Sequence, residues 1–172
     1  VEDYFQVSAF DPYISRNAWD SIPCRVEQNI DRILSLLENR EINATFFTLG
    51  WIAKRYPSMV RRIVENGHEL ASHGCDHDRV TELGSNEFYK DIDDSKKILE
   101  DISGSPVIGY RAPSFSINKQ NYWALNLLEE AGYLYSSSIY PVRHDHYGIP
   151  DAPRFAFYPN SAGKLLEVPI TT

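Results

Sequence analysis

The spacing of apolar residues along the chain changes repeatedly between that of a helix and that of a buried strand. Between residues 24 and 40, apolar side chains recur every three or four positions, as they do on the buried face of a helix. The next stretch, residues 44–49, reads Ala-Thr-Phe-Phe-Thr-Leu and is apolar or β-branched throughout, as a buried strand is. This part of the pattern predicts a helix, a turn and a strand.

The same alternation continues to the end of the chain. Further helices are expected from Pro57 to the residue before Gly67, over 85–102 and over 119–131, and strands over 69–72, 107–110, 133–139, 155–158 and 165–170. Strands that alternate with helices form parallel sheets with both faces covered. The pattern therefore predicts an α/β fold, either an open doubly wound sheet or a closed barrel, with its site at the carboxyl ends of the strands.

Length and composition narrow the class of protein. A chain of 172 residues with 42% hydrophobic and 24% charged residues suits one globular domain, and we expect residues 1–172 to form a single domain. The formal net charge of -7 argues against nucleic acid as a partner, because phosphate binding needs a basic surface. No apolar run reaches the roughly 18 residues of a membrane span, so no transmembrane segment is expected. The pattern does not indicate an oligomeric state.

Two histidines, His73 and His77, follow the strand expected over 69–72. On one helical turn, side chains four positions apart are neighbours, so both imidazoles could reach one ion. The alternative is an ordinary polar loop, which is the commoner origin of an isolated His-x-x-x-His. Here an acidic pair, Glu2 and Asp3, opens the chain, and Asp76 is a candidate acceptor for an imidazole N–H. Two histidines and a carboxylate are the ligands of a catalytic zinc site.

Four segments carry a resemblance to a known family. They are Ala-Thr-Phe-Phe at 44–47, Gly-His-Glu-Leu-Ala-Ser-His at 67–73, the histidine motif at 73–77 and Arg-Ala-Pro at 111–113. In this order they resemble the motifs of the polysaccharide deacetylases of carbohydrate esterase family 4, the NodB-homology domain. The match spans roughly residues 1–139. The family's histidine motif reads His-Ser/Thr-x-x-His, whereas Gly74 stands at the hydroxyl position here.

The resemblance implies a distorted (β/α) barrel of the polysaccharide deacetylase type, seven-stranded when complete. Residues 1–172 would form one catalytic domain, apparently truncated at both ends. The family's first motif carries two acids, one the general base and the other a metal ligand. Val1-Glu2-Asp3 resembles the branch that reads Asp-Val-Glu-Asp, related to the exopolysaccharide-locus (XrtA/PEP-CTERM-associated) deacetylases. That branch places the base immediately before Val1 and makes Glu2 the metal ligand, with Asp3 as the fallback. Asp3 is also taken as a catalytic candidate, together with Arg111 and His144. In the adjacent-acid form of the motif, Glu2 is instead the base and Asp3 the ligand.

The resemblance also implies roles for the arginine motif. Arg111 would orient the base carboxylate through a bidentate pair. Pro113, Ser114 and Phe115 would contact the substrate, with the Ser114 N–H holding the oxyanion of the tetrahedral intermediate. Because that N–H belongs to the backbone, this role does not depend on the serine side chain.

The family's general acid is a histidine on a late strand, and the resemblance places it beyond Thr172. Two other imidazoles remain in the last part of the chain. His144 is the candidate for a sugar contact or for the acid itself, and His146 is a weaker one.

The function implied by the resemblance is hydrolysis of N-acetyl groups on a polysaccharide or oligosaccharide, in carbohydrate metabolism or exopolysaccharide biosynthesis. One divalent ion, zinc, would be held by Glu2, His73 and His77. A cytoplasmic or membrane-peripheral location is favoured. Two alternatives stay open, an allantoinase-like amidase acting on a small cyclic amide and a carbohydrate-binding pseudoenzyme. A non-acidic residue before Val1 would favour the pseudoenzyme.

Overall fold

The computed structural model describes residues 1–145, 147–161 and 163–170, so the weaker candidate His146 lies outside the described residues. Among these residues, five strands form one sheet in the order β1-β2-β3-β4-β5, and every neighbouring pair is parallel. The strands are β1 (Thr45–Thr48), β2 (Glu69–Ser72), β3 (Gly109–Tyr110), β4 (Tyr135–Ser136) and β5 (Leu166–Glu167). The predicted α/β fold is confirmed, and a seven-stranded barrel stays a prediction.

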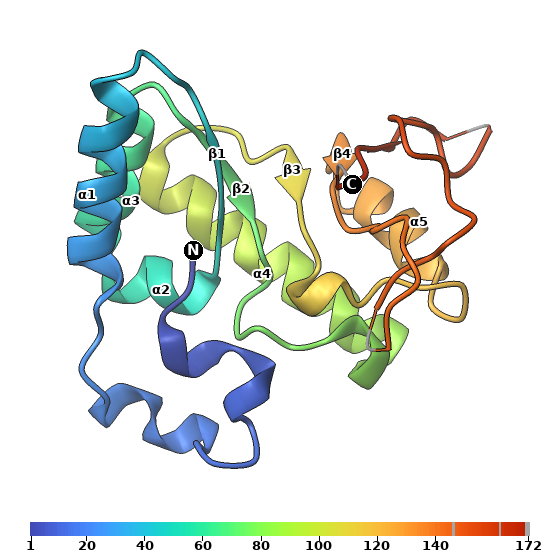
Figure 1. Cartoon of the computed structure of the whole chain (residues 1–172), viewed down its shortest axis with the longest axis horizontal. Helices are drawn as coiled ribbons and strands as arrows, with labels where there is room; N and C mark the ends of the chain where they lie inside the picture. Colours follow the sequence, from blue (N-terminus) through green and yellow to red (C-terminus); the bar gives the residue numbers. More distant parts are fainter. Residues whose placement is uncertain (146, 162, 171–172) are drawn as a thin grey trace.

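In the described ranges, five α-helices connect or cover these strands (Figure 1). They are α1 (Val26–Glu38), α2 (Gly50–Arg55), α3 (Pro57–Glu65), α4 (Ser85–Ser103) and α5 (Trp123–Glu130). Helix α2 was not predicted, because six residues are too few to establish a helical repeat. None of the helices in the described part of the chain combines the length and hydrophobicity that a membrane span requires.

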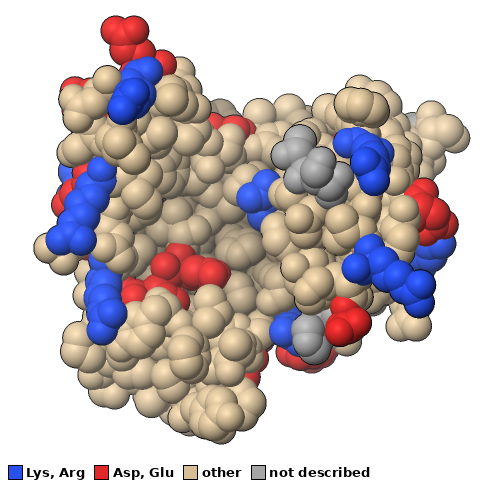
Figure 2. All heavy atoms as spheres, viewed as in Figure 1, with Lys and Arg blue, Asp and Glu red and all other residues tan. Residues whose placement is uncertain are grey.

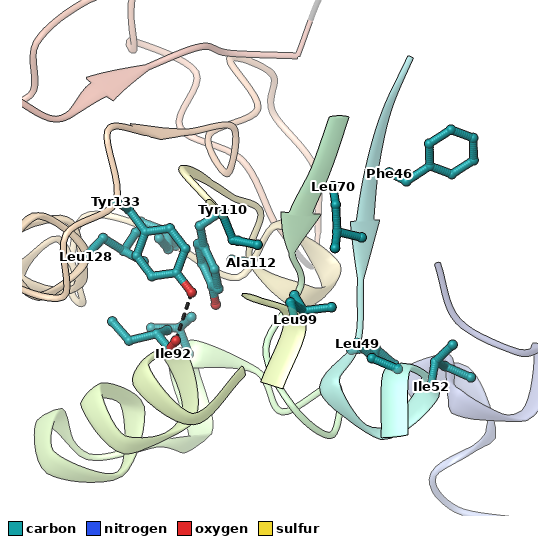
Figure 3. Close-up of a cluster of buried hydrophobic side chains, with 14 of the residues drawn as sticks. Phe46, Leu49, Ile52, Leu70, Ile92, Leu99, Tyr110, Ala112, Leu128 and Tyr133 are labelled. Carbon is teal, nitrogen blue, oxygen red and sulfur yellow. Dashed lines mark hydrogen bonds between the residues drawn. The ribbon is translucent and has the colours of Figure 1, made fainter. Parts of the chain in front are cut away.

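The hydrophobic core lies between the sheet and its helices (Figure 3). Helix α4 packs against β2 and against α2, α3 and α5. Fully or almost fully buried side chains come from the strands and from the helices. Among them are Leu49, Ile52, Leu70, Ile92, Leu99, Tyr110 and Leu128. The one polar atom that Tyr133 brings into this core is satisfied, because its hydroxyl donates to the Ile92 carbonyl at 2.8 Å.

Short helices of the 3-10 type occupy several connections. Three of them, η1 (Tyr4–Gln6), η2 (Ser8–Phe10) and η3 (Arg16–Ser21), lie in the segment that precedes α1. Two more, η4 (Val80–Glu82) and η5 (Pro113–Phe115), follow the carboxyl ends of β2 and β3. Figure 1 shows the segment before α1 beside the end of the sheet where the strands terminate.

The strands after β2 are shorter than the pattern predicts. The stretch expected to be a strand over 133–139 pairs only at Tyr135 and Ser136, and 155–158 contributes a single antiparallel bridge from Phe157 to Glu167. Beyond Ser136, the polar groups of Ser137 and Ser138 bond to Arg111 and Ala112. Side-chain hydrogen bonds replace the ladder there, which ends the strand.

One register row crosses the whole sheet. Thr48 pairs with Ser72, Ser72 with Tyr110, Tyr110 with Ser136, and Ser136 with Glu167. Val1 extends this row beyond β1, because its N–H donates to Phe47 and its carbonyl accepts from Leu49. These two hydrogen bonds are those of a parallel ladder in which Val1 stands opposite Thr48. The residues that follow the row, Glu2, His73, Arg111 and Ser137, consequently lie at one level at the carboxyl ends.

Candidate metal centre

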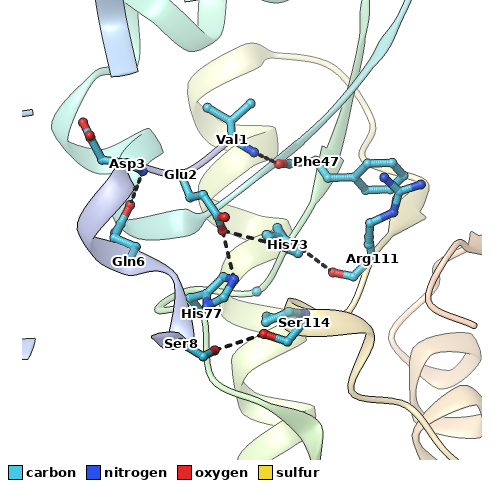
Figure 4. Close-up of polar contacts among 12 residues, drawn as sticks. Val1, Glu2, Asp3, Gln6, Ser8, Phe47, His73, His77, Arg111 and Ser114 are labelled. Carbon is cyan, nitrogen blue, oxygen red and sulfur yellow. Dashed lines mark hydrogen bonds and ion pairs between the residues drawn. The ribbon is translucent and has the colours of Figure 1, made fainter. Parts of the chain in front are cut away.

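Glu2, His73 and His77 converge at the carboxyl end of the sheet (Figure 4). One potential ligand atom from each lies within 4.8 Å of the others. Glu2 Oε2 is 2.9 Å from His77 Nε2 and 3.6 Å from His73 Nε2. The structure therefore brings together the three residues that the resemblance implies as metal ligands.

The position of each imidazole has a local cause. The His73 N–H donates to the Thr48 carbonyl, so this residue continues the ladder one step past β2. Its Nδ1 atom lies 2.7 Å from the carbonyl oxygen of Arg111. A carbonyl can only accept, so Nδ1 carries the proton and Nε2 keeps a lone pair, which faces Glu2. This is the second contact that metal-binding histidines commonly make.

The donor set suits a divalent cation. Glu2 Oε2 is buried and makes no hydrogen bond of acceptable geometry with any described residue, although His77 Nε2 is near. Burial lowers the pKa of His73, which favours the neutral imidazole that a metal requires. Burial acts in the opposite direction on Glu2, but the N–H groups and charges of His73 and His77, when these imidazoles are protonated, outweigh it and hold the pKa of this carboxyl far below its usual range. An ionised carboxylate and two imidazoles thus meet at one point.

The histidine motif is not a helical turn, contrary to the geometry expected from its spacing. Residues 73–77 form a loop in which Gly74 and His77 both have left-handed backbones, with φ of 78° and 61°. The loop is bound to α2 and α4: the Gly74 carbonyl accepts from the Gly50 N–H, and the Cys75 N–H donates to Asp91 Oδ1 at 2.8 Å. These tertiary hydrogen bonds, rather than a helical repeat, bring the two imidazoles together.

Asp76, a suggested acceptor for an imidazole N–H, hydrogen bonds to neither histidine. It lines a separate cavity of about 630 Å³ together with Cys75 and Asp91. The acceptor is the Arg111 carbonyl instead, because β3 ends beside β2 and carries that carbonyl next to His73.

Asp3 points away from the histidines and has a different task (Figure 4). It is 3% exposed, and its Oδ2 accepts the backbone N–H groups of Arg25 and Val26 at 2.5 and 2.9 Å. Its Oδ1 accepts from Tyr4. A carboxylate at the first turn of α1 satisfies N–H groups that have no partner within the helix. Both oxygens are therefore engaged in a cap, which argues against the catalytic or ligand role considered for Asp3.

Arg111 lies on the other side of His73. Its guanidinium is 4.1 Å from the centre of the Phe47 ring, and it donates from Nε to the Ser137 carbonyl at 2.9 Å and from NH2 to Ser137 Oγ at 2.7 Å. Burial lowers the pKa of this guanidinium. It forms no ion pair with a carboxylate of the described residues, so the expected bidentate partner of Arg111 stays a prediction.

Pro113, Ser114 and Phe115 form η5 directly after the arginine. Ser114 and Phe115 adopt left-handed backbones with φ of 53° and 48°, a costly conformation for residues other than glycine. The Ser114 N–H donates to no acceptor among the described residues. Ser114 Oγ contacts Ser8 Oγ at 3.0 Å, which brings the N-terminal segment against this turn. The turn can therefore offer a backbone N–H.

His144 stands apart from the metal centre. It is exposed, and its ring stacks on Tyr147 with the centroids 3.9 Å apart. Tyr147 also contacts Tyr140 and Phe115, whose ring lies 5.7 Å from the Arg111 guanidinium. A series of rings thus leads from Arg111 outward to His144. This position suits a sugar contact better than proton transfer, and His144 as the acid stays a prediction.

A family model described as polysaccharide deacetylase matches residues 17–136, which is more than half of the chain. The chain belongs to the polysaccharide deacetylase family. A second model, described as a domain of unknown function, matches residues 137–172. The branch associated with exopolysaccharide loci is not distinguished by these matches.

Individual relatives agree with the family. The peptidoglycan-N-acetylglucosamine deacetylase PgdA of Listeria monocytogenes is 34% identical over 88 residues, which are 51% of this chain and 19% of that protein. The chain thus spans about a fifth of the length of this relative. A crystal structure of a putative polysaccharide deacetylase from Mycobacterium smegmatis is 27% identical with a TM-score of 0.72, covering 91% of this chain and 53% of the other. Puue allantoinase, 23% identical with a TM-score of 0.66 over 83% of this chain and 43% of that one, shares the fold.

The departure of Gly74 from the deacetylase motif has a structural counterpart in α4. A Cβ atom at Gly74 would lie 2.6 Å from Asp91 Oδ2, and the positive φ already disfavours a side chain. The Asp91 carboxylate occupies the space beside the loop and accepts the next N–H along it. Sequence reasoning missed this residue, because an acid among the other polar residues of α4, such as Glu87 and Asp94, carries no distinctive signal.

Ser137 and Glu167 were also missed. Ser137 binds Arg111 directly, and Glu167 is completely buried at the end of β5. Ser137 is the middle one of three consecutive serines within the strand expected over 133–139, so it carried no specific signal. Glu167 interrupts the apolar stretch over 165–170, and a charge within a predicted buried strand was the one available indication.

Proposed function

We propose that this protein is a metal-dependent N-deacetylase that hydrolyses acetamido groups on an N-acetylated glycan. The observation that carries the proposal is the convergence of Glu2 Oε2 with the Nε2 atoms of His73 and His77. Membership of the polysaccharide deacetylase family and the name of the relative PgdA support a glycan with N-acetylglucosamine units as the substrate. Within this class, an exopolysaccharide is the proposed polymer.

Glu2, His73 and His77 would hold the ion, which we propose to be zinc. When bound, such an ion supplies Lewis acidity that polarises an acetyl oxygen and lowers the pKa of a water. The protein's part is to orient His73 through the Arg111 carbonyl, to keep its imidazole neutral by burial, which lowers its pKa, and to keep Glu2 ionised. The Ser114 N–H donates to the oxygen that gains charge as the amide is attacked.

Arg111 would keep a base carboxylate ionised and oriented. The base is placed at the aspartate predicted immediately before Val1. Two contacts support this assignment: Val1 is hydrogen bonded to Phe47, and the ring of Phe47 lies under the Arg111 guanidinium. Phe115, Tyr140 and Tyr147 form an aromatic surface beside Arg111 that suits the apolar face of a sugar ring.

The decisive experiment measures metal content and acetate release together. Wild type and His73→Ala, both extended to include the residue before Val1, are loaded with zinc, dialysed, analysed for metal and assayed on a tetramer of N-acetylglucosamine. Wild type should retain one ion per chain and release acetate, whereas His73→Ala should lose both. His68→Gln is the matched control, because His68 is buried beside Phe46 at the opposite end of β2.

Equal metal content in wild type and His73→Ala would refute the ligand assignment. Bound metal without acetate release, in a protein extended to include the residue before Val1, would contradict the deacetylase proposal. Hydrolysis of allantoin in that case would indicate a small-amide hydrolase, and sugar binding without hydrolysis would indicate a pseudoenzyme.

A further inference from the structure

Glu167 is a buried acid that the proposed reaction does not use. It ends β5, stands opposite Ser136 in the register row and is 0% exposed. Its Oε1 accepts the N–H groups of Ser138 and Ile139, each at 2.8 Å, while its Oε2 has no hydrogen-bond partner among the described residues. Burial raises the pKa of this carboxyl, an effect that the two N–H groups and the charge of Arg111 oppose. A buried acid that accepts two consecutive amides determines where that piece of backbone lies.

The backbone held by Glu167 is also the partner of the arginine motif. Ser137 offers its carbonyl to Arg111 Nε and its hydroxyl to NH2, and the Ser138 hydroxyl accepts the Ala112 N–H at 2.9 Å. A second hydroxyl, from Ser136, donates to Ser138 Oγ at 2.8 Å. The side chain of Arg111 and the backbone of Ala112 are therefore both attached to 137–138. Glu167 accepts the N–H groups of Ser138 and Ile139, so it binds the same piece of backbone.

These contacts cross the boundary between the two matched segments. The polysaccharide deacetylase match ends at residue 136, and Ser137 and Glu167 belong to the stretch matched as a domain of unknown function. The sheet does not stop at this boundary, because β5 pairs with β4 in parallel. Tyr140 and Tyr147, which contact Phe115, come from the same stretch.

We propose that the segment 137–170 is an integral part of the deacetylase site, in which Glu167 is the positioning residue that holds Ser137 and Ser138 and, through them, the guanidinium of Arg111. The inference rests on the proposed deacetylase function for its kinetic consequence, but the geometry it asserts can be measured without activity. Loss of Oε1 leaves two buried amides without an acceptor, and the turn at 137–138 then moves together with its bonds to Arg111. Because Arg111 is only half-buried, it has room to follow.

The full chain, zinc-loaded and extended as for the deacetylase assay, is compared with Glu167→Ala, Glu167→Gln and Glu129→Ala. Glu129 is the matched control, because it also accepts a backbone N–H from this segment, that of Lys164 at 2.7 Å, but on α5 and away from Arg111. The first measurement is hydrogen exchange of the Arg111 Nε–H by ¹⁵N NMR, assigned from the signal that Arg111→Lys removes. Wild type, Glu167→Gln and Glu129→Ala should show a slowly exchanging signal, and Glu167→Ala a fast one. Gln keeps the oxygen that accepts both amides, so this conservative variant should preserve the arrangement.

The second measurement is kcat/KM for acetate release from the N-acetylglucosamine tetramer at saturating zinc. A displaced positioning group costs on the order of 10- to 100-fold in rate, and Glu167→Ala should lose that much in kcat with little change in KM. The double variant Arg111→Ala/Glu167→Ala should be no slower than Arg111→Ala alone, because Glu167 acts through Arg111.

Additive losses in the double variant, or an Arg111 Nε–H that exchanges as slowly in Glu167→Ala as in wild type, would overturn the inference. Should Glu167→Ala not fold, Glu167→Asp takes its place, since it keeps the charge but withdraws the acceptor by one methylene. Its Arg111 signal must then exchange faster than in wild type for the inference to survive. Absence of acetate release from wild type, with the exchange pattern as expected, would reject the proposed function and leave the positioning role intact.

Discussion

His73 and Arg111 are joined through a hydrogen bond between the imidazole Nδ1 of the first and the backbone carbonyl of the second, 2.7 Å apart. The hydrogen bond therefore couples the residue that we propose as a metal ligand to the residue that carries the guanidinium. β2 and β3 are neighbours in the sheet, and both residues follow the last paired position, Ser72 and Tyr110. We therefore expect a shift of the backbone at Arg111 to rotate the His73 imidazole, so that the histidine motif and the arginine motif respond together.

Glu2 and Asp3 can be distinguished by substituting each with alanine. Glu2→Ala should abolish zinc retention with a small effect on folding, because the ion pairs that Oε2 makes among the described residues are with the two histidines. Asp3→Ala should keep the ion but lower the free energy of unfolding by about 1–2 kcal/mol, the usual loss for a removed helix cap. Metal analysis and urea unfolding of the metal-free proteins provide the two measurements. Asp3→Asn, which keeps an acceptor, is the control. Loss of zinc from Asp3→Ala but not from Glu2→Ala would restore the arrangement in which Asp3 is the ligand.

Restoring a hydroxyl residue at position 74 should damage this protein although the family motif carries one. Gly74→Ser introduces a Cβ that meets Asp91 Oδ2 at 2.6 Å on a backbone with φ of 78°. Gly67→Ser is the matched control, because Gly67 has φ of 79° and nothing within 4 Å of the added Cβ. The strain common to both variants is on the order of 1–3 kcal/mol, so the further loss in Gly74→Ser reports the collision with Asp91.

The same collision predicts a coupling between the two positions. Removing the carboxylate in Gly74→Ser/Asp91→Ala should cost less stability than the sum of the two single losses. Zinc affinity should weaken in Gly74→Ser and not in Gly67→Ser, because Gly74 lies between the two histidines that we propose as metal ligands and Gly67 does not. Additive free energies of unfolding, or equal zinc affinities of the two serine variants, would show that Asp91 does not compete for the space beside the loop.

Asp91 should also impose a pH dependence on stability. Burial, with the nearby charges of Asp78 and Asp76, raises the pKa of Asp91 from 3.8 to about 6, although the Cys75 N–H opposes this shift. Below pH 3.8 the carboxyl is protonated in both the folded and the unfolded state. As the pH rises to about 6, the unfolded chain loses this proton first, so the contribution to stability decreases by up to about 3 kcal/mol.

Asp91→Asn isolates this contribution, because its amide does not titrate and all other titratable groups are the same in this variant and in wild type. The free energy of unfolding of Asp91→Asn minus that of wild type should increase between about pH 4 and about pH 7, measured by urea unfolding with a chelator present. Asp94→Asn, one turn away on the same helix and paired with the exposed Lys90, is the control and should show a much smaller change. A difference between Asp91→Asn and wild type that stays constant over this range contradicts the raised pKa.

Particular residues show which elements the sequence pattern predicted correctly and which it did not. The apolar spacing over 24–40 and the strand at 44–49 located α1 and β1 to within two residues at each end, because a long periodic helix and a compact β-rich run are local properties. The pattern extended the later strands too far, since Tyr133 to Ile139 has strand-forming residues but pairs with a neighbour only at Tyr135 and Ser136. Pairing depends on what lies beside a segment, which local composition does not specify.

The sequence by itself determined which chemical groups are present and in what order: two histidines after a strand, an acidic pair before the first helix, and Arg-Ala-Pro after a later strand. These determine the family, because the motifs are short and contiguous. Only the tertiary structure decided that Glu2 faces the histidines while Asp3 caps α1. It also decided that residues 73–77 form a loop that hydrogen bonds to Asp91, and that Arg111 donates to Ser137. Each of these outcomes depends on how strand ends align across the sheet and where a chain turns after its last paired residue. Contacts between segments that are far apart in sequence determine both the alignment of the strand ends and the position of the turn.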